Sequence, residues 1–116
     1  MQKRWLLVLF LFPLLLWAAV KDGVVTVAVA GTRQPLIATR TPAVWITVQC
    51  HPDNTGDCYV GGSTIADGRG VELAPGDSHH FPTMGEFRDY YDLSQIYADV
   101  AVNGNRLLYV YAQRIP

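Results

Sequence analysis

Apolar and polar positions alternate with a period of two along residues 44–50. One side of an extended chain there carries Val44, Ile46, Val48 and Cys50, and the other carries Trp45, Thr47 and Gln49. This alternation predicts a half-buried β-strand. Turn-forming residues at 52–56 then reverse the chain, and residues 58–60 predict a returning strand that ends at Gly61-Gly62. If the two strands pair, Cys50 and Cys58 lie close together at the neck of this central hairpin.

The remainder of the chain shows the same pattern of short extended segments between turns. Further strands are expected at 24–29, 36–37, 63–66, 71–73, 79–81, 96–102 and 106–113. Pro75-Gly76 suits a type II turn, Asp92 can cap a single helical turn, and Asn103-Gly104 is a strong signal for a type I′ hairpin. Turns at roughly eight- to twelve-residue intervals predict an all-β domain, a small antiparallel β-sandwich or jelly-roll-like barrel.

The alternating positions also predict which side chains form the core. We expect it to contain Val44, Ile46, Val48, Val60, Ile65, Leu73, Phe81, Ile96, Val100, Val102, Leu108 and Val110. The last strand is apolar or aromatic on both sides. Because Leu108 and Val110 are assigned to the core, Leu107, Tyr109 and Tyr111 are expected to face outward. Because large exposed apolar patches are uncommon on monomers, we predict that these three, with Tyr97, form an interface.

The first twenty residues differ from the rest. Lys3-Arg4 precedes an uncharged apolar run, residues 5–20, that is broken only by Pro13. This pattern is typical of a secretory signal, although no good cleavage site follows, and the run is shorter than the about 20 residues of a bilayer span. We therefore divide the chain into an apolar segment at 1–20, which is a signal, an anchor or an assembly arm, and one domain at 21–116.

Length and charge narrow the classes of function. The 116 residues suffice for one domain, and the net charge of −1 with a pI near 6.2 provides no basic field. Lysines and arginines are scattered along the chain, so we expect no binding of nucleic acid. Contact with a membrane is expected only through residues 5–20.

Candidate chemistry is sparse. Cys50 and Cys58 could form one disulfide in an oxidising compartment, or could be two small core residues; two cysteines fall short of the usual four zinc ligands. The loop with Asp53 and Asp57 offers calcium too few oxygens, and His79-His80 would point to opposite faces of a strand.

Catalytic motifs are equally weak. Ser63 does not lie in a G-x-S-x-G nucleophile elbow, and no phosphate-binding glycine motif occurs. We expect no catalytic residue, no metal and no cofactor.

Aromatic residues offer the main binding alternative. Trp45 and the tyrosines at 59, 90, 91, 97, 109 and 111 could form a face that stacks on sugars or binds protein. In strands such residues more often serve packing.

Three segments resemble small structural β-domain proteins of tailed bacteriophages. Residues 47–62 match an "N-T-G-x-x-Y-V-G" hairpin, residues 70–78 an "L-x-P-G-[DE]-S" turn, and residues 92–99 a "D-L-x-x-I-Y-x-D" strand entry. The resemblance covers about residues 24–113. It implies a head decoration, head-fibre or tail-associated protein without catalysis, and the family has no catalytic residues to carry over. The apolar N-terminus and the two cysteines depart from the family pattern.

The resemblance leads to a functional hypothesis. We expect a non-enzymatic virion protein that decorates or stabilises the particle, bound to other virion proteins as a homo-oligomer or within a lattice. The alternative is a secreted, periplasmic or membrane-anchored β-sandwich that binds carbohydrate or protein.

Overall fold

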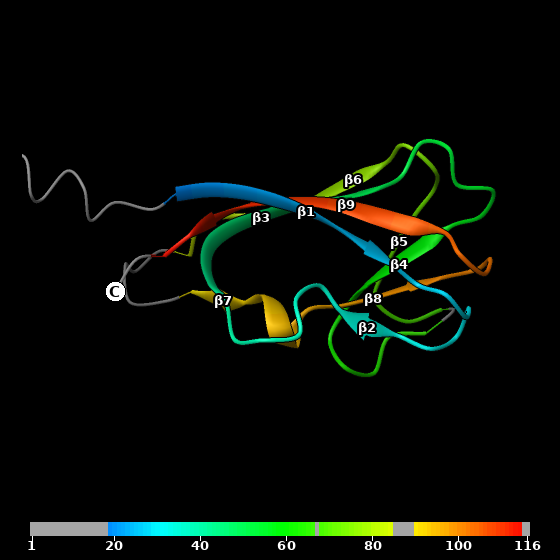
Figure 1. The fold of residues 1–116 in the computed structure, drawn as a ribbon, viewed down its shortest axis with the longest axis horizontal. Coiled ribbons are helices and arrows are strands. Elements are labelled where there is room, and N and C mark those ends of the chain that lie inside the picture. Colours follow the sequence, from blue (N-terminus) through cyan, green and yellow to red (C-terminus); the bar gives the residue numbers. More distant parts are fainter. Residues whose placement is uncertain (1–18, 67, 85–89, 115–116) are drawn as a thin grey trace, which may run out of the picture.

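The structure, a computed structural model, describes residues 19–66, 68–84 and 90–114. It is an all-β fold of two antiparallel sheets packed face to face, which confirms the predicted sandwich (Figure 1). The strands are β1 (Ala19–Thr26), β2 (Gln34–Pro35), β3 (Pro42–Cys50), β4 (Cys58–Gly61), β5 (Val71–Leu73), β6 (Ser78–Phe81), β7 (Tyr91–Asp92), β8 (Tyr97–Val100) and β9 (Arg106–Gln113), and one 3₁₀ turn, η1, spans Leu93–Gln95.

The two sheets differ in length. The larger one has the order β1-β9-β3-β6, with β7 also paired to β3, and the smaller one has the order β2-β8-β4-β5. β1, β3 and β9 span eight or nine residues each, whereas the strands of the smaller sheet span two to four. Within the described residues, no helix is long and apolar enough to cross a bilayer.

Strands that follow one another mostly lie in different sheets. The loop after β3 carries the chain into the smaller sheet, and the turn after β8 carries it back, so neither expected hairpin forms. Asn103 does not adopt a positive φ, as a type I′ turn would require, and only Gly104 does, at 80°. The turn instead links the sheets, with the Asn103 side chain accepting a hydrogen bond from the Ala30 amide at 2.7 Å.

The core fills the space between the sheets. Seven of the predicted core residues are buried: Ile46, Val48, Val60, Ile65, Leu73, Ile96 and Val100. Phe81 is half-buried and packs against this core. Val102 is wrongly predicted, because β8 ends at Val100 and Val102 lies in the following turn, where it is 39% exposed.

A β-bulge explains why Val44 is outside the core. The register between β3 and β9 shifts between Ala43 and Trp45, so one extra residue enters β3 at this point. A bulge moves the chain on by one residue and reverses the faces on either side of it. Ala43 and Ile46 are therefore both buried, and Val44 is only half-buried.

The two faces of β9 are the reverse of the prediction. Leu107, Tyr109 and Tyr111 point inward and are buried, because they pair with the inward residues Cys50, Val48 and Ile46 of β3. Leu108 and Val110 point outward and are half-exposed. A shift of one residue exchanges the faces of a whole strand, and the neighbouring strand decides which face turns inward.

The start of β1 falls within the segment assigned to residues 1–20. Ala19 and Val20 pair with Gln113 and Ala112 of β9, so the folded sheet begins two residues before the expected boundary. Residues 1–18 lie outside the described residues, as does their expected role as a signal, anchor or assembly arm.

Candidate functional site

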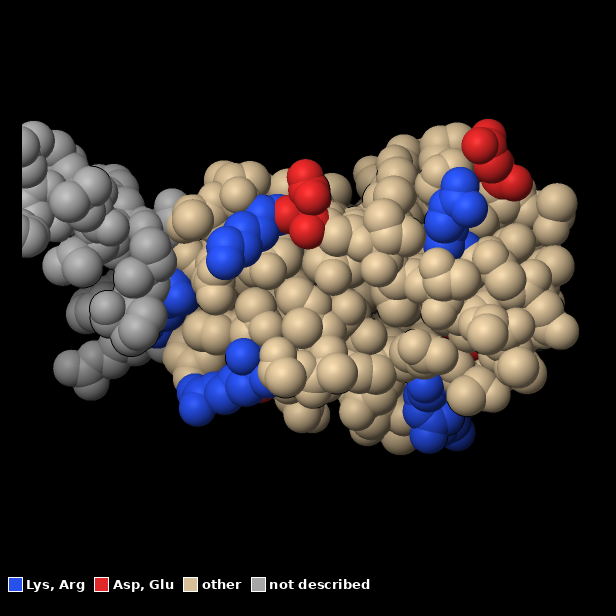
Figure 2. All heavy atoms as spheres, in the orientation of Figure 1, with Lys and Arg blue, Asp and Glu red and all other residues tan. Residues whose placement is uncertain are grey.

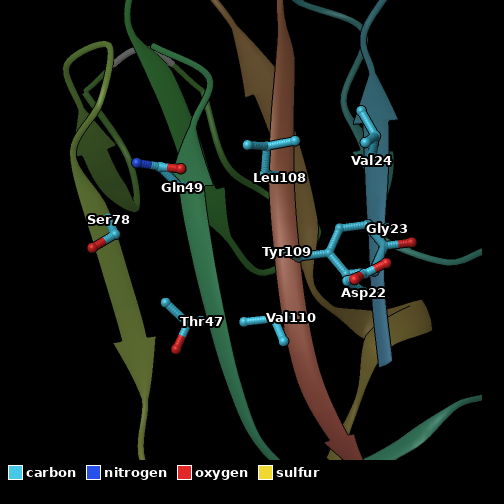
Figure 3. A pocket seen from close by; sticks show the side chains of 9 residues that line it. All are labelled: Asp22, Gly23, Val24, Thr47, Gln49, Ser78, Leu108, Tyr109 and Val110. Carbon is cyan, nitrogen blue, oxygen red and sulfur yellow. The ribbon is translucent and has the colours of Figure 1, made fainter. Parts of the chain in front are cut away.

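The outer face of the five-stranded sheet is built from two rows of side chains that run across its strands. The first row contains His80, Thr47, Val110 and Asp22, and the second contains Ser78, Gln49, Leu108 and Val24, from β6, β3, β9 and β1 respectively. Figure 3 shows these strands side by side, with the labelled side chains of both rows on the same surface. Each row is polar at its β6–β3 end. At the β9–β1 end the second row is apolar, whereas the first row ends in Val110 and the carboxylate of Asp22.

A groove of about 540 Å³ lies over these rows. Its lining includes Val24, Leu108 and Val110 on the apolar side, and Thr47, Gln49 and Ser78 on the polar side. A sheet with one solvated face ordinarily alternates apolar-in and polar-out, so an apolar residue at successive outward positions of β9 departs from that pattern. The groove is therefore the leading candidate for a binding surface.

The polar half of this face is held in place by hydrogen bonds. Thr47 Oγ1 lies 2.8 Å from His80 Nδ1, and the Gln49 amide nitrogen donates to the Gly76 carbonyl at 3.1 Å. The Trp45 and His80 rings lie 6.0 Å apart in a tilted arrangement beside the first row. These contacts fix the orientation of three polar side chains, so a partner would meet a pre-organised surface.

The apolar half extends to the edge of the sheet. Val24 and Val20 of β1 are 54% and 66% exposed, next to half-exposed Leu108 and Val110. Asp22 lies between the two valines on the same face. In the view of Figure 2, charged side chains are few and scattered over a mainly uncharged surface.

Tyr109 lies beneath this face. Its ring fills the space left by Gly23, the residue opposite it on β1, because a Cβ there would overlap the ring. Burial raises the pKa of Tyr109 above its ordinary value of 10, and nearby Tyr111 and Asp22 raise this pKa further. Burial likewise raises the pKa of Tyr111. Both hydroxyls are therefore neutral at neutral pH.

The residues predicted to form an interface are not brought together at the surface. Leu107, Tyr109 and Tyr111 are inside the sandwich, so the interface assigned to them is wrong. Tyr97 is half-buried in the other sheet, where it lines a second, polar hollow of about 440 Å³ with Arg33 and Ser63. Leu108 and Val110 lie instead on the outward side of β9, where the prediction placed Leu107, Tyr109 and Tyr111.

Cys50 and Cys58 form a disulfide that joins the end of β3 to the start of β4, with their Cα atoms 5.6 Å apart. Asn54, in the loop between them, bonds to the backbone of Arg106 in both directions. Its amide nitrogen donates to the Arg106 carbonyl at 2.7 Å, and its carbonyl accepts from the Arg106 amide at 3.1 Å. The disulfide and Asn54 together fasten this loop to the first residue of β9.

The other candidate metal-binding or catalytic residues, the aspartates of the loop after β3 and the histidines, make contacts within the fold. Asp57 accepts from the Ala101 amide through its backbone carbonyl, and the imidazole of His51 accepts from the Asp53 amide. His79 and His80 point to opposite faces of β6, as expected, with His79 against Phe81 and His80 against Trp45. Across residues 19–66, 68–84 and 90–114, no three of the potential metal-binding side chains cluster closely enough to share an ion.

No protein-family model matches this chain, and no curated protein matches it.

Proposed function

We propose that this chain is a non-enzymatic structural protein of a tailed-bacteriophage particle, which it decorates or stabilises by contact with neighbouring proteins. The observation that carries the proposal is the half-apolar outer face of its largest sheet. A surface with Leu108, Val110, Val24 and Val20 in one area is suited to a permanent protein contact, because covering apolar area releases water.

The segments that resemble phage structural proteins all shape the scaffold. Asn54 fastens the loop after β3, and the Pro75-Gly76 turn bonds to the same end of β3 through the Gly76 amide and the Cys50 carbonyl, 2.9 Å apart. Asp92 caps η1 by accepting from the Ser94 amide at 3.0 Å. Each segment thus fixes a loop or a turn of the sandwich, which supports a structural function for the residues that carry the resemblance.

Purified particles provide the test. A prophage carrying the gene for this chain would be induced, and its particles purified on a density gradient and washed in high salt. We expect the chain to sediment with head or tail proteins in a fixed ratio to them. Its recovery entirely outside the particle fractions would refute the proposal.

A second candidate is a secreted or membrane-anchored binding domain, which the Cys50–Cys58 disulfide favours, because disulfides persist mainly in oxidising compartments. The mass of the intact chain distinguishes the two. A chain that retains residues 1–18, which precede β1, in a particle supports the virion proposal, whereas loss of these residues from a periplasmic or secreted product supports the alternative.

A further inference from the structure

β1 offers a partner two surfaces, its free edge and its outer face. It pairs with β9 along all eight residues, and within the described part of the chain no strand pairs with its other side. Lys21 lies opposite Tyr111, on the side of the strand that turns inward, and it is exposed. A charge on the inward side of an edge strand opposes pairing with a further strand, so the outer face is the better contact surface.

The two rows of the outer face are complementary to each other. A second copy turned by 180° about an axis across the strands would place its first row over the second row of the original. Leu108 would then meet Val110, Gln49 would meet Thr47, Ser78 would meet His80, and Val24 would lie against Asp22. At β9 apolar side chains meet apolar ones, and at β3 and β6 polar side chains meet groups with which they can exchange hydrogen bonds. At β1, Val24 instead meets the Asp22 carboxylate.

We propose that the outer face of the β1-β9-β3-β6 sheet is an interface between two copies of this chain, stacked face to face about this two-fold axis. The same patch serves both copies, as in any isologous dimer. Packed sheets lie about 10 Å apart, which leaves room for the Leu108 and Val110 side chains of the two copies to interdigitate. The inference goes beyond the virion proposal, because it applies to the chain alone in solution.

The size of the face sets the expected strength. β1, β9 and β3 with about 25 Å of strand length each and the four-residue β6 with about 13 Å, all about 4.8 Å apart, give roughly 420 Å² on each copy, or about 850 Å² in total. This is below the about 1,000–1,200 Å² at which stable specific interfaces begin, and it falls in the range of weak, transient ones. We therefore expect a reversible dimer that forms at high protein concentration.

The test uses the full chain and two valines of equal exposure. Val24→Glu places a carboxylate against Asp22 of the second copy, and Val29→Glu makes the same change at a residue outside the groove; the two side chains are 54% and 56% exposed. Sedimentation velocity over a concentration series gives the dimer dissociation constant of each. We expect Val24→Glu to raise it about tenfold or more and Val29→Glu to leave it unchanged.

Val24→Lys tests the arrangement. Its ammonium group would lie against Asp22 of the second copy, so we expect dimerisation as strong as in the parent chain or stronger. Circular dichroism and thermal unfolding of each variant establish that it is folded. A parent chain that stays monomeric overturns the proposal. Association that Val24→Glu leaves unchanged also overturns it; association through residues 1–18 would give this result. Equal weakening by Val24→Glu and Val24→Lys also overturns it.

Discussion

At the scale of single residues, Asn54 makes four side-chain hydrogen bonds that join the loop after β3 to β9 and to the disulfide. Its side chain pairs with the Arg106 backbone in both directions and donates toward both sulfurs of the disulfide, at 3.2 and 3.3 Å. Asn54→Ala would leave the Arg106 groups without these partners, so we expect a loss of about 2 kcal/mol in the free energy of unfolding.

Chemical denaturation measures this loss, and Asp53→Ala in the same loop is the control. The Asp53 side chain is exposed, so its removal should change stability by less than about 0.5 kcal/mol. Equal stability of Asn54→Ala and Asp53→Ala would show that the Asn54 bonds contribute nothing.

Asp92 makes stability depend on pH. Burial alone would raise its pKa, but hydrogen bonds from Thr41 and Ser94, with the nearby Arg40 charge, outweigh burial and hold the pKa below 3.8. A lowered folded pKa stabilises the fold fully above the unfolded value, and this stabilisation is lost as pH falls through the folded pKa.

Asp92→Asn keeps the capping oxygen and removes the charge. We expect unfolding curves between pH 5 and pH 2 to show a shallower acid loss for this variant than for the parent chain. An unchanged acid slope would mean that Asp92 does not contribute to it.

At the scale of elements, the contact between β1 and β9 depends on Gly23. An added Cβ would overlap the Tyr109 ring, so Gly23→Ala must displace either the ring or the strand. Such overpacking costs about 1–3 kcal/mol. Gly62→Ala is the control, since a Cβ there meets no atom within 4 Å.

Thermal unfolding compares the two glycine variants. We expect a lower midpoint for Gly23→Ala only, together with a change in tyrosine fluorescence as Tyr109 becomes exposed. A Gly23→Ala chain as stable as Gly62→Ala would contradict the close packing of Tyr109 beneath β1.

The positions of the strands could be predicted from the sequence better than the pairing between them. Alternation found β3, β4 and β9, and turn residues marked their ends, because both signals are local. Two outcomes depended on distant residues. The bulge at Val44 reversed the faces at the start of β3, and pairing with β3 decided which side of β9 turns inward.

The candidate site shows the same division. Apolar residues on both sides of β9 indicated correctly that one apolar side lies outside the core, but alternation alone could not identify which side. Only the pairing of Tyr109 with Val48 places Leu108 and Val110 outside. The groove also takes Asp22 and Val24 from β1 and Ser78 from β6, which are far from β9 in sequence and become its neighbours only in the folded sheet.

At the scale of the whole molecule, one end of the sandwich holds the strands in place and the outer face of the larger sheet is available for contact. The disulfide, the Pro75-Gly76 turn and Asn54 tie one end together, which holds the long strands of the larger sheet in place. This support keeps the outer face in a fixed shape, so covering it costs little conformational entropy. A rigid scaffold with one half-apolar face agrees with a protein that works in contact with its neighbours.

Hydroxyl-radical labelling of purified particles tests this account most directly, because it reports which side chains are covered. Leu108 and Val110 would be compared in intact particles and in the chain released from them and diluted until it is monomeric, with Val29 as an exposed reference outside the groove. We expect labelling of Leu108 and Val110 to fall several-fold in the particle relative to Val29. Equal labelling in both states, or particles that do not contain the chain, would contradict the account.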